Sequence, residues 1–162
     1  RAGQTEALHT LIFCVRLADP EEVDILTNLV VRSKFYWGYD KKYRASLKTI
    51  LAVSREKASI GDCWVAEAET GDPVAVCQFN SNASPPHLDL LFVEPTYIGQ
   101  GVGSLLFENL IATARRRGIK QINLDADPNA AAFYVAKGGR VIGERESRIV
   151  RGQFLPVIEF IL

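Results

Sequence analysis

The sequence predicts one mixed α/β domain that is antiparallel in its N-terminal half, and three observations support this prediction. The 162 residues suffice for one domain, and 48% of them are apolar, so the chain can bury a core. Residues 63–69 and 74–79 are apolar segments around a Thr-Gly-Asp-Pro turn, which is typical of a β-hairpin. The apolar strand 87–93 leads through a glycine-rich loop into an amphipathic helix.

The N-terminal part is predicted to hold a strand and two helices before the hairpin. Residues 8–18 are rich in β-branched and aromatic side chains, which favours a strand. A helix is expected to start at Asp19-Pro20, because Asp is a good N-cap and Pro fits the first turn, and to end near Gly38. A second helix is expected after Asp40.

The C-terminal part is predicted to alternate helices and strands. The helix that follows the glycine-rich loop should end at Gly118, after a run of arginines that suits the negative end of the helix dipole. The remaining elements are expected at residues 119–124 (strand), 128–137 (short helix), 140–143 and 155–161 (two strands).

Charge and cysteine content exclude several classes of protein. The 19 basic residues balance the 19 acidic ones, so no nucleic-acid partner is expected. No apolar run approaches the about 18 residues of a membrane span, so no membrane partner is expected. Cys14, Cys63 and Cys77 are odd in number and lack Cys-x-x-Cys spacing, which favours reduced thiols and a cytoplasmic location. No metal is expected, because no cluster has metal-ligand spacing.

The glycine-rich loop, residues 98–104, has a context that suits phosphate binding. Its glycines permit close approach to the backbone, and the amides and dipole of the following helix attract an anion. The loop has no Lys for a P-loop, and Ser104 stands where a dinucleotide-binding motif needs its third Gly, although Asp125 is at a suitable distance for the acidic residue of that motif. A simple connecting turn is the third interpretation.

Two segments resemble the signatures of a known family. Leu91-Phe92-Val93-Glu94-Pro95 followed by Gly99-Gln100-Gly101-Val102-Gly103 resembles the acetyl-CoA motif of the GNAT superfamily of N-acetyltransferases. Asp127-Pro128-Asn129-Ala130, Phe133-Tyr134 and Gly138-Gly139 are similar to its second signature, at a spacing that also fits.

The resemblance extends over residues 87–143, with two departures. Ile98 stands where Gln or Arg is usual in the family, which should weaken one pyrophosphate contact. Gly139 stands where an aromatic residue is common, which should cost packing but not chemistry.

The resemblance implies a fold, an activity and partners. The fold would be a mixed, mostly antiparallel sheet that splays between its fourth and fifth strands, flanked by about four helices. Residues 1–162 would form a single domain, with 1–8 as a mobile N-terminal arm. The activity would be acetyl transfer from acetyl-CoA to a primary amine by direct attack in a ternary complex, with a small-molecule or peptide acceptor and a possible homodimer. The alternatives are a non-catalytic acyl-CoA-binding domain and an enzyme with another acyl donor or an oxygen acceptor.

The resemblance also implies which residues hold acetyl-CoA. The backbone of Leu91, Phe92 and Val93 would pair with the pantetheine arm, in a wedge opened by a bulge and a splay of the strand. Asn129 would hydrogen-bond the pantetheine region, although it can equally cap a helix. Backbone amides would hold the pyrophosphate at Ile98, Gly99, Gln100, Gly101, Val102, Gly103 and Ser104.

Tyr134 matches the family's general acid, which would protonate the departing thiolate and contact the cofactor, although it can equally pack with Phe133. Asp89 is the candidate general base, because burial in an apolar strand is expected to raise its pKa. A solvated carboxylate is the alternative for Asp89, and His87 on the same strand is a second candidate base that would act through water.

The acceptor is expected to meet the aromatic segment 35–39, in which Trp37 and Tyr39 can hold a cationic amine or an apolar body. Core packing is the alternative for these aromatic residues. Arg148 and Arg151 in the last hairpin connection can meet an acidic group on the acceptor, or lie in a solvated turn.

Overall fold

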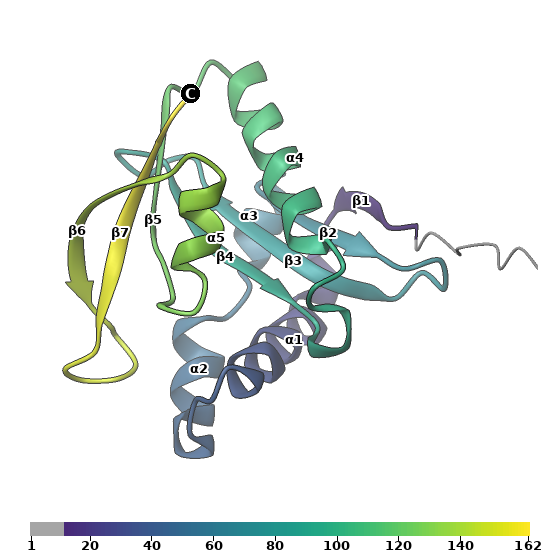
Figure 1. The fold of residues 1–162 in the computed structure, drawn as a ribbon. Coiled ribbons are helices and arrows are strands. Elements are labelled where there is room, and N and C mark those ends of the chain that lie inside the picture. Colours follow the sequence, from purple (N-terminus) through teal and green to yellow (C-terminus); the bar gives the residue numbers. More distant parts are fainter. Residues whose placement is uncertain (1–11) are drawn as a thin grey trace, which may run out of the picture.

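A seven-stranded sheet forms the centre of the protein in the computed structural model, which describes residues 12–162 (Figure 1). The strand order is β1-β2-β3-β4-β5-β7-β6. In chain order the strands are β1 (Cys14–Leu17), β2 (Cys63–Glu67), β3 (Pro73–Asn80), β4 (His87–Val93), β5 (Gln121–Asp125), β6 (Arg140–Glu146) and β7 (Phe154–Ile161).

Neighbouring strands run antiparallel except for β4 and β5, which are parallel. The register of β4 with β5 has a single pair, His87 with Asn123, so the two strands part beyond it. The predicted mixed, mostly antiparallel sheet with a splay between its fourth and fifth strands is therefore confirmed.

Within residues 12–162, five α-helices flank the sheet, one more than expected. They are α1 (Val23–Tyr36), α2 (Arg44–Ile50), α3 (Arg55–Ser59), α4 (Val102–Arg116) and α5 (Ala131–Ala136). Helix α3 was not predicted, because its five residues are too short to show a helical period. Its start is nevertheless specified by Ser54, whose hydroxyl accepts a bond from the Lys57 amide.

The two faces of the sheet bury separate cores. On one face α4 and α5 cover a cluster centred on Phe79, Leu106 and Leu110, none of which is exposed. On the other face α1 and α3 cover a cluster that includes Leu26 and Val65 (Figure 1). Because both faces are covered, β3 reads as a continuous apolar run rather than an alternating one.

Several element boundaries differ from those predicted. The first strand begins at Cys14 rather than residue 8, and the start of that prediction and the arm 1–8 lie outside the described residues. Helix α5 begins at Ala131 rather than Pro128, because residues 127–130 form a hydrogen-bonded turn first. Gly38 does end the first helical segment, with φ at +94°.

The packing around residue 139 explains why glycine stands there in place of the aromatic residue that is common in the family. A Cβ built there would lie 2.6 Å from Ile158 Cγ2 and 2.7 Å from Phe160 Cζ. The space of a larger side chain is thus already filled by β7, and the expected packing loss is not found.

No helix within residues 12–162 combines the length and apolarity needed to cross a membrane. Cys14, Cys63 and Cys77 all carry free thiols, and Cys63 and Cys77 are buried. Burial raises the pKa of the Cys63 thiol to about 12, so this thiol is protonated and unreactive at neutral pH.

Candidate active site

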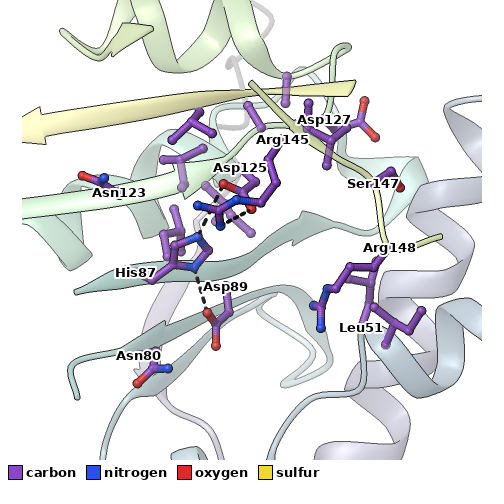
Figure 2. Close-up of a pocket in the computed structure, with 18 of the residues that line it drawn as sticks. Leu51, Asn80, His87, Asp89, Asn123, Asp125, Asp127, Arg145, Ser147 and Arg148 are labelled. Carbon is purple, nitrogen blue, oxygen red and sulfur yellow. Dashed lines mark hydrogen bonds and ion pairs between the residues drawn. The ribbon is translucent and has the colours of Figure 1, made fainter. Parts of the chain in front are cut away.

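The separation of β4 from β5 opens a cleft of about 560 Å³. Its walls come from the two strands, the end of α1, the end of α2, the start of α5 and the loop between β6 and β7 (Figure 2). The cleft therefore lies where the sheet is interrupted, and it gathers residues that are far apart in the sequence.

A β-bulge in β4 carries one of the predicted site residues into this cleft. Leu90 faces Gln78 on β3 and Leu88 faces Phe79, so Asp89 is the extra residue between the two pairs. The bulge brings the Asp89 side chain beside that of His87, with His87 Nδ1 2.9 Å from Asp89 Oδ1.

The carboxylate of Asp89 is fully engaged. Lys57 Nζ donates to Oδ2 at 2.7 Å, and Gln78 Nε2 donates to the same oxygen at 3.4 Å. Burial acts to raise the pKa of Asp89, but the bonds from His87 and Lys57 outweigh it, and the pKa lies below its ordinary value. The expected raised pKa is thus wrong, because the sequence does not reveal that a lysine and a histidine neutralise this acid.

His87 lies between two carboxylates, one from each of the parting strands (Figure 2). Its Nε2 is 3.9 Å from Asp125 Oδ1, an ion-pair distance too long for a hydrogen bond. The carboxylates of Asp125 and Asp89 raise the pKa of His87 to about 9, so the ring is cationic at neutral pH. No metal-binding group of His, Cys, Asp and Glu is found within the part of the chain that the structure describes.

Tyr134 lines the cleft from α5 and is 6% exposed. Its ring meets Phe107 and Phe133 edge to face, with ring centroids 5.8 and 5.1 Å away. Burial raises the pKa of the phenol, so it keeps its proton at neutral pH. The two interpretations of Tyr134, aromatic packing and a protonated donor at the cleft, are therefore compatible.

The loop before α4 presents free amide groups. Gly99 and Gly101 have φ of +84° and +82°, in the left-handed region that glycine favours. Within residues 12–162, the amides of residues 99–104 donate to no protein acceptor, while the Ile98 amide donates to Pro95 O at 3.3 Å. Six of the seven predicted amides are therefore open, and that of Ile98 is occupied.

The last three residues of β4 have one open backbone edge. Leu91, Phe92 and Val93 pair with β3 on one side. On the other side the register with β5 has ended at His87, so for the described strands this edge has no partner. An extended ligand can add to such an edge by backbone hydrogen bonds.

Asn129 lies exposed after β5 and does not cap α5, whose N-cap residue is Ala130. The amide of its side chain donates to Asp127 Oδ1 at 3.0 Å. Asp127 also accepts from Lys34 Nζ at 2.8 Å and from Tyr39 Oη at 3.0 Å. This carboxylate thus joins the end of β5 to α1.

The two predicted acceptor residues have different positions. Tyr39 lines the cleft, whereas Trp37 is 43% exposed, packs edge to face on Tyr36 and is absent from the cleft walls described here. Residue 37 follows the last turn of α1, which directs its indole to solvent. Arg148 lines the cleft, but Arg151 is not among its lining residues.

Five charged residues of the site were missed as site residues. They are Lys34, Asp125, Asp127, Arg145 and Glu146, all of which line the cleft. A signal existed for Lys34, because it lies on the same face of α1 as Leu26 and Val30 and so had to be buried with a partner. Arg145 was missed because β6 was predicted to end at residue 143; it donates to Asp125 Oδ2 at 3.1 Å.

Comparison with known proteins adds family information to this geometry. Residues 59–138 match the family described as "Acetyltransferase (GNAT) domain". The peptidyl-lysine N-acetyltransferase YjaB of Salmonella typhimurium is 29% identical over 104 residues. That match covers 64% of this chain and 66%, just under two thirds, of the relative.

Solved structures share the fold over almost the whole chain. The PaiA N-acetyltransferase of Thermoplasma acidophilum, in complex with coenzyme A, matches with a TM-score of 0.74 at 17% identity, covering 93% of this chain and 99% of that one. A GCN5-related N-acetyltransferase from Rhodopseudomonas palustris matches with a TM-score of 0.71 at 23% identity, covering 92% and 95%.

Proposed function

Since the chain belongs to the GNAT family of acetyltransferases, we propose that it transfers an acetyl group from acetyl-CoA to a primary amine by direct attack in a ternary complex. The observation that carries the proposal is the splayed pair β4 and β5, with an open strand edge and a protonated tyrosine at one cleft, and with a loop of free amides directly after β4. The name of the Salmonella relative supports a primary amine as the acceptor.

The residues present fit coenzyme A without a basic pocket. The free amides of residues 99–104 and the N-terminus of α4 suit a pyrophosphate, because they offer donors and a positive dipole end. The open edge of residues 91–93 suits the amide groups of the pantetheine arm. Asn129 is exposed beside this path and can add a contact by leaving Asp127.

Acetyl-CoA supplies an activated acetyl carbon, so that a C–N bond forms, the C–S bond breaks, and the departing thiolate requires a proton. We assign that proton to the hydroxyl of Tyr134, which lines the cleft and is protonated at neutral pH. Within the described structure, Tyr39 is the other tyrosine in the cleft wall, but its hydroxyl already donates to Asp127.

Asp89 is assigned a positioning role rather than proton abstraction. Its lowered pKa makes it a weak base, and its carboxylate holds Lys57 and the cationic His87 in place at the bulge. His87 is cationic at neutral pH and cannot accept a proton there. The proton of the amine therefore leaves to water in the cleft. Tyr39 contributes an aromatic wall on the same side.

Two measurements test the proposal. Acetyl-CoA at 100 times its dissociation constant should stabilise the fold by about 2.7 kcal/mol, seen as a rise in the melting temperature. Thiol release in the presence of a panel of primary amines should then exceed the rate without amine. An unchanged melting curve at millimolar acetyl-CoA would contradict the cofactor assignment. Stabilisation without acetyl transfer to any amine would favour the alternative, a non-catalytic acyl-CoA-binding domain.

A further inference from the structure

A second recess of about 360 Å³ adjoins the cleft beside the bulge of β4. Six residues are common to the walls of both cavities, namely Ile50, Leu51, Asn80, His87, Asp89 and Arg148. The remaining polar walls of the recess are Ser54, Lys57 and Gln78. The recess thus extends the cleft toward α3 and the end of α2.

The recess is rich in hydrogen-bond donors and positive charge. Lys57, His87 and Arg148 are three cations, and Asp89 is the single acid among its lining residues. Both oxygens of that acid are already engaged, Oδ1 by His87 and Oδ2 by Lys57. The walls therefore carry an excess of positive charge that the protein does not neutralise.

Arg148 supplies that excess. It has no ion pair and donates no hydrogen bond to any of residues 12–162, in contrast to Arg145, which is paired with Asp125. Figure 2 shows its side chain extending from the β6–β7 loop beside Leu51, with the guanidinium directed toward the side of the cleft that holds Asp89. A guanidinium presents a planar fork of donors that matches a carboxylate.

From this arrangement we propose that the acceptor is an amine that also carries a carboxylate, which binds Arg148 in this recess while the amine enters the cleft. The proposal rests on the acetyltransferase function proposed above and names its substrate class. A carboxylate fits better than a phosphate, because Glu146 and Asp89 also line the two cavities and disfavour a second negative charge.

The physical consequence is that the enzyme should discriminate against amines that lack the carboxylate. An amine without the carboxylate gains nothing from Arg148 and leaves the positive charge of the recess walls uncompensated. A lost charge-assisted hydrogen bond of this kind costs about tenfold in affinity or more. The carboxylate should therefore lower KM more than it raises kcat, because it does not touch the reacting atoms.

Matched pairs of amines that differ only by the carboxylate test the proposal: lysine and cadaverine, ornithine and putrescine, arginine and agmatine. Thiol release is measured with acetyl-CoA, and binding to the coenzyme A complex is measured by calorimetry. We expect kcat/KM or affinity at least tenfold higher for the carboxylate-bearing member of one or more pairs. Arg148→Gln should bring that ratio close to one, mainly through KM.

Arg151→Gln is the matched control, since it removes the same charge from the same loop outside the cleft walls. It should keep the wild-type ratio, and both variants should keep the acetyl-CoA-induced rise in melting temperature. Equal or better use of the decarboxylated amines would overturn the proposal, as would acetyl-CoA binding with neither transfer to nor binding of any carboxylate-bearing member. Failure to bind acetyl-CoA would instead refute the proposed function itself.

Discussion

His87 and Asn123 are the only residue pair through which β4 and β5 register with each other in the described sheet. The same His87 side chain lies between Asp89 of β4 and Asp125 of β5. The point where the sheet opens is therefore held by charge as well as by backbone pairing, and the residues that hold it also line the cleft.

Tyr134→Phe should lower kcat about 100-fold, because a positioned general acid contributes that much or more. The ring and its contacts with Phe107 and Phe133 are kept, so the fold and the affinity for acetyl-CoA should change little. Steady-state kinetics under conditions where chemistry limits the rate measures the first, and thermal shift the second. Tyr43→Phe, which removes a phenol outside the cleft walls, should have wild-type kcat. Wild-type turnover of Tyr134→Phe would remove Tyr134 from the mechanism.

Gly101→Ala should weaken coenzyme A binding. A Cβ at Gly101 meets no atom within 4 Å, but φ of +82° is strained for alanine by about 1 kcal/mol, so the loop should shift its amides. Gly118→Ala is the control, because Gly118 has φ of +75° at the other end of α4. Both variants should lose similar stability in urea unfolding, and only Gly101→Ala should bind coenzyme A more weakly by calorimetry. Equal affinities would argue against the loop as the pyrophosphate site.

Stability should fall as pH rises from about 6.5 to 8.5. The pKa of His87 is about 9 in the folded state and 6.5 without the fold, so the folded protein holds more protons in this range. The contribution of His87 to the free energy of unfolding is therefore fully present below pH 6.5 and is lost as pH rises through the folded pKa. The loss between pH 6.5 and 8.5 is about 2 kcal/mol. Asp89 and Asp125, whose pKa values lie below their ordinary range, stay ionised throughout this interval.

Urea unfolding at successive pH values measures this slope. His87→Gln keeps a side chain that can hydrogen-bond but cannot be charged, so its stability should be lower at pH 6.5 and flatter up to pH 8.5. The window stops there because thiols of the unfolded chain ionise above it. A wild-type slope in His87→Gln would show that another group causes the pH dependence.

Lys34→Met should destabilise the protein by about 3 kcal/mol, because it leaves the buried carboxylate of Asp127 without its cation. The side chains of the pair are only 8% and 10% exposed. Arg55→Gln breaks the ion pair with Glu21, whose side chains are 60% and 76% exposed, and should cost less than about 1 kcal/mol. The free energy of unfolding in urea measures both, and equal losses would contradict the structural importance of the Lys34–Asp127 pair.

The sequence was most informative where function depends on the backbone. The strand 87–93 and the glycine-rich loop were predictable, because glycine positions and apolar runs record backbone geometry, whereas the splay was implied by the family resemblance. Side-chain partners across the fold were not predictable. Nothing in the sequence places Lys57 of α3 beside Asp89, and this contact reversed the expected direction of the Asp89 pKa.

The boundaries of the helical segments were predicted with mixed success. Asp19 starts the first helical segment as expected, because its capping box is local. Helix α5 starts three residues later than expected, because residues 127–130 form a hydrogen-bonded turn first. Long-range contacts account instead for the error in the expected Asp89 pKa.

The tight fit around Gly139 has a consequence for how this sequence can diverge. Because Ile158, Phe160 and the backbone carbonyl of Tyr134 all lie within 2.9 Å of a Cβ at residue 139, a homologue with a larger residue there requires smaller side chains at 158 and 160 and a shift of the end of α5. The three positions should therefore vary together, with total side-chain volume approximately preserved. A larger residue introduced at position 139 alone should destabilise this protein.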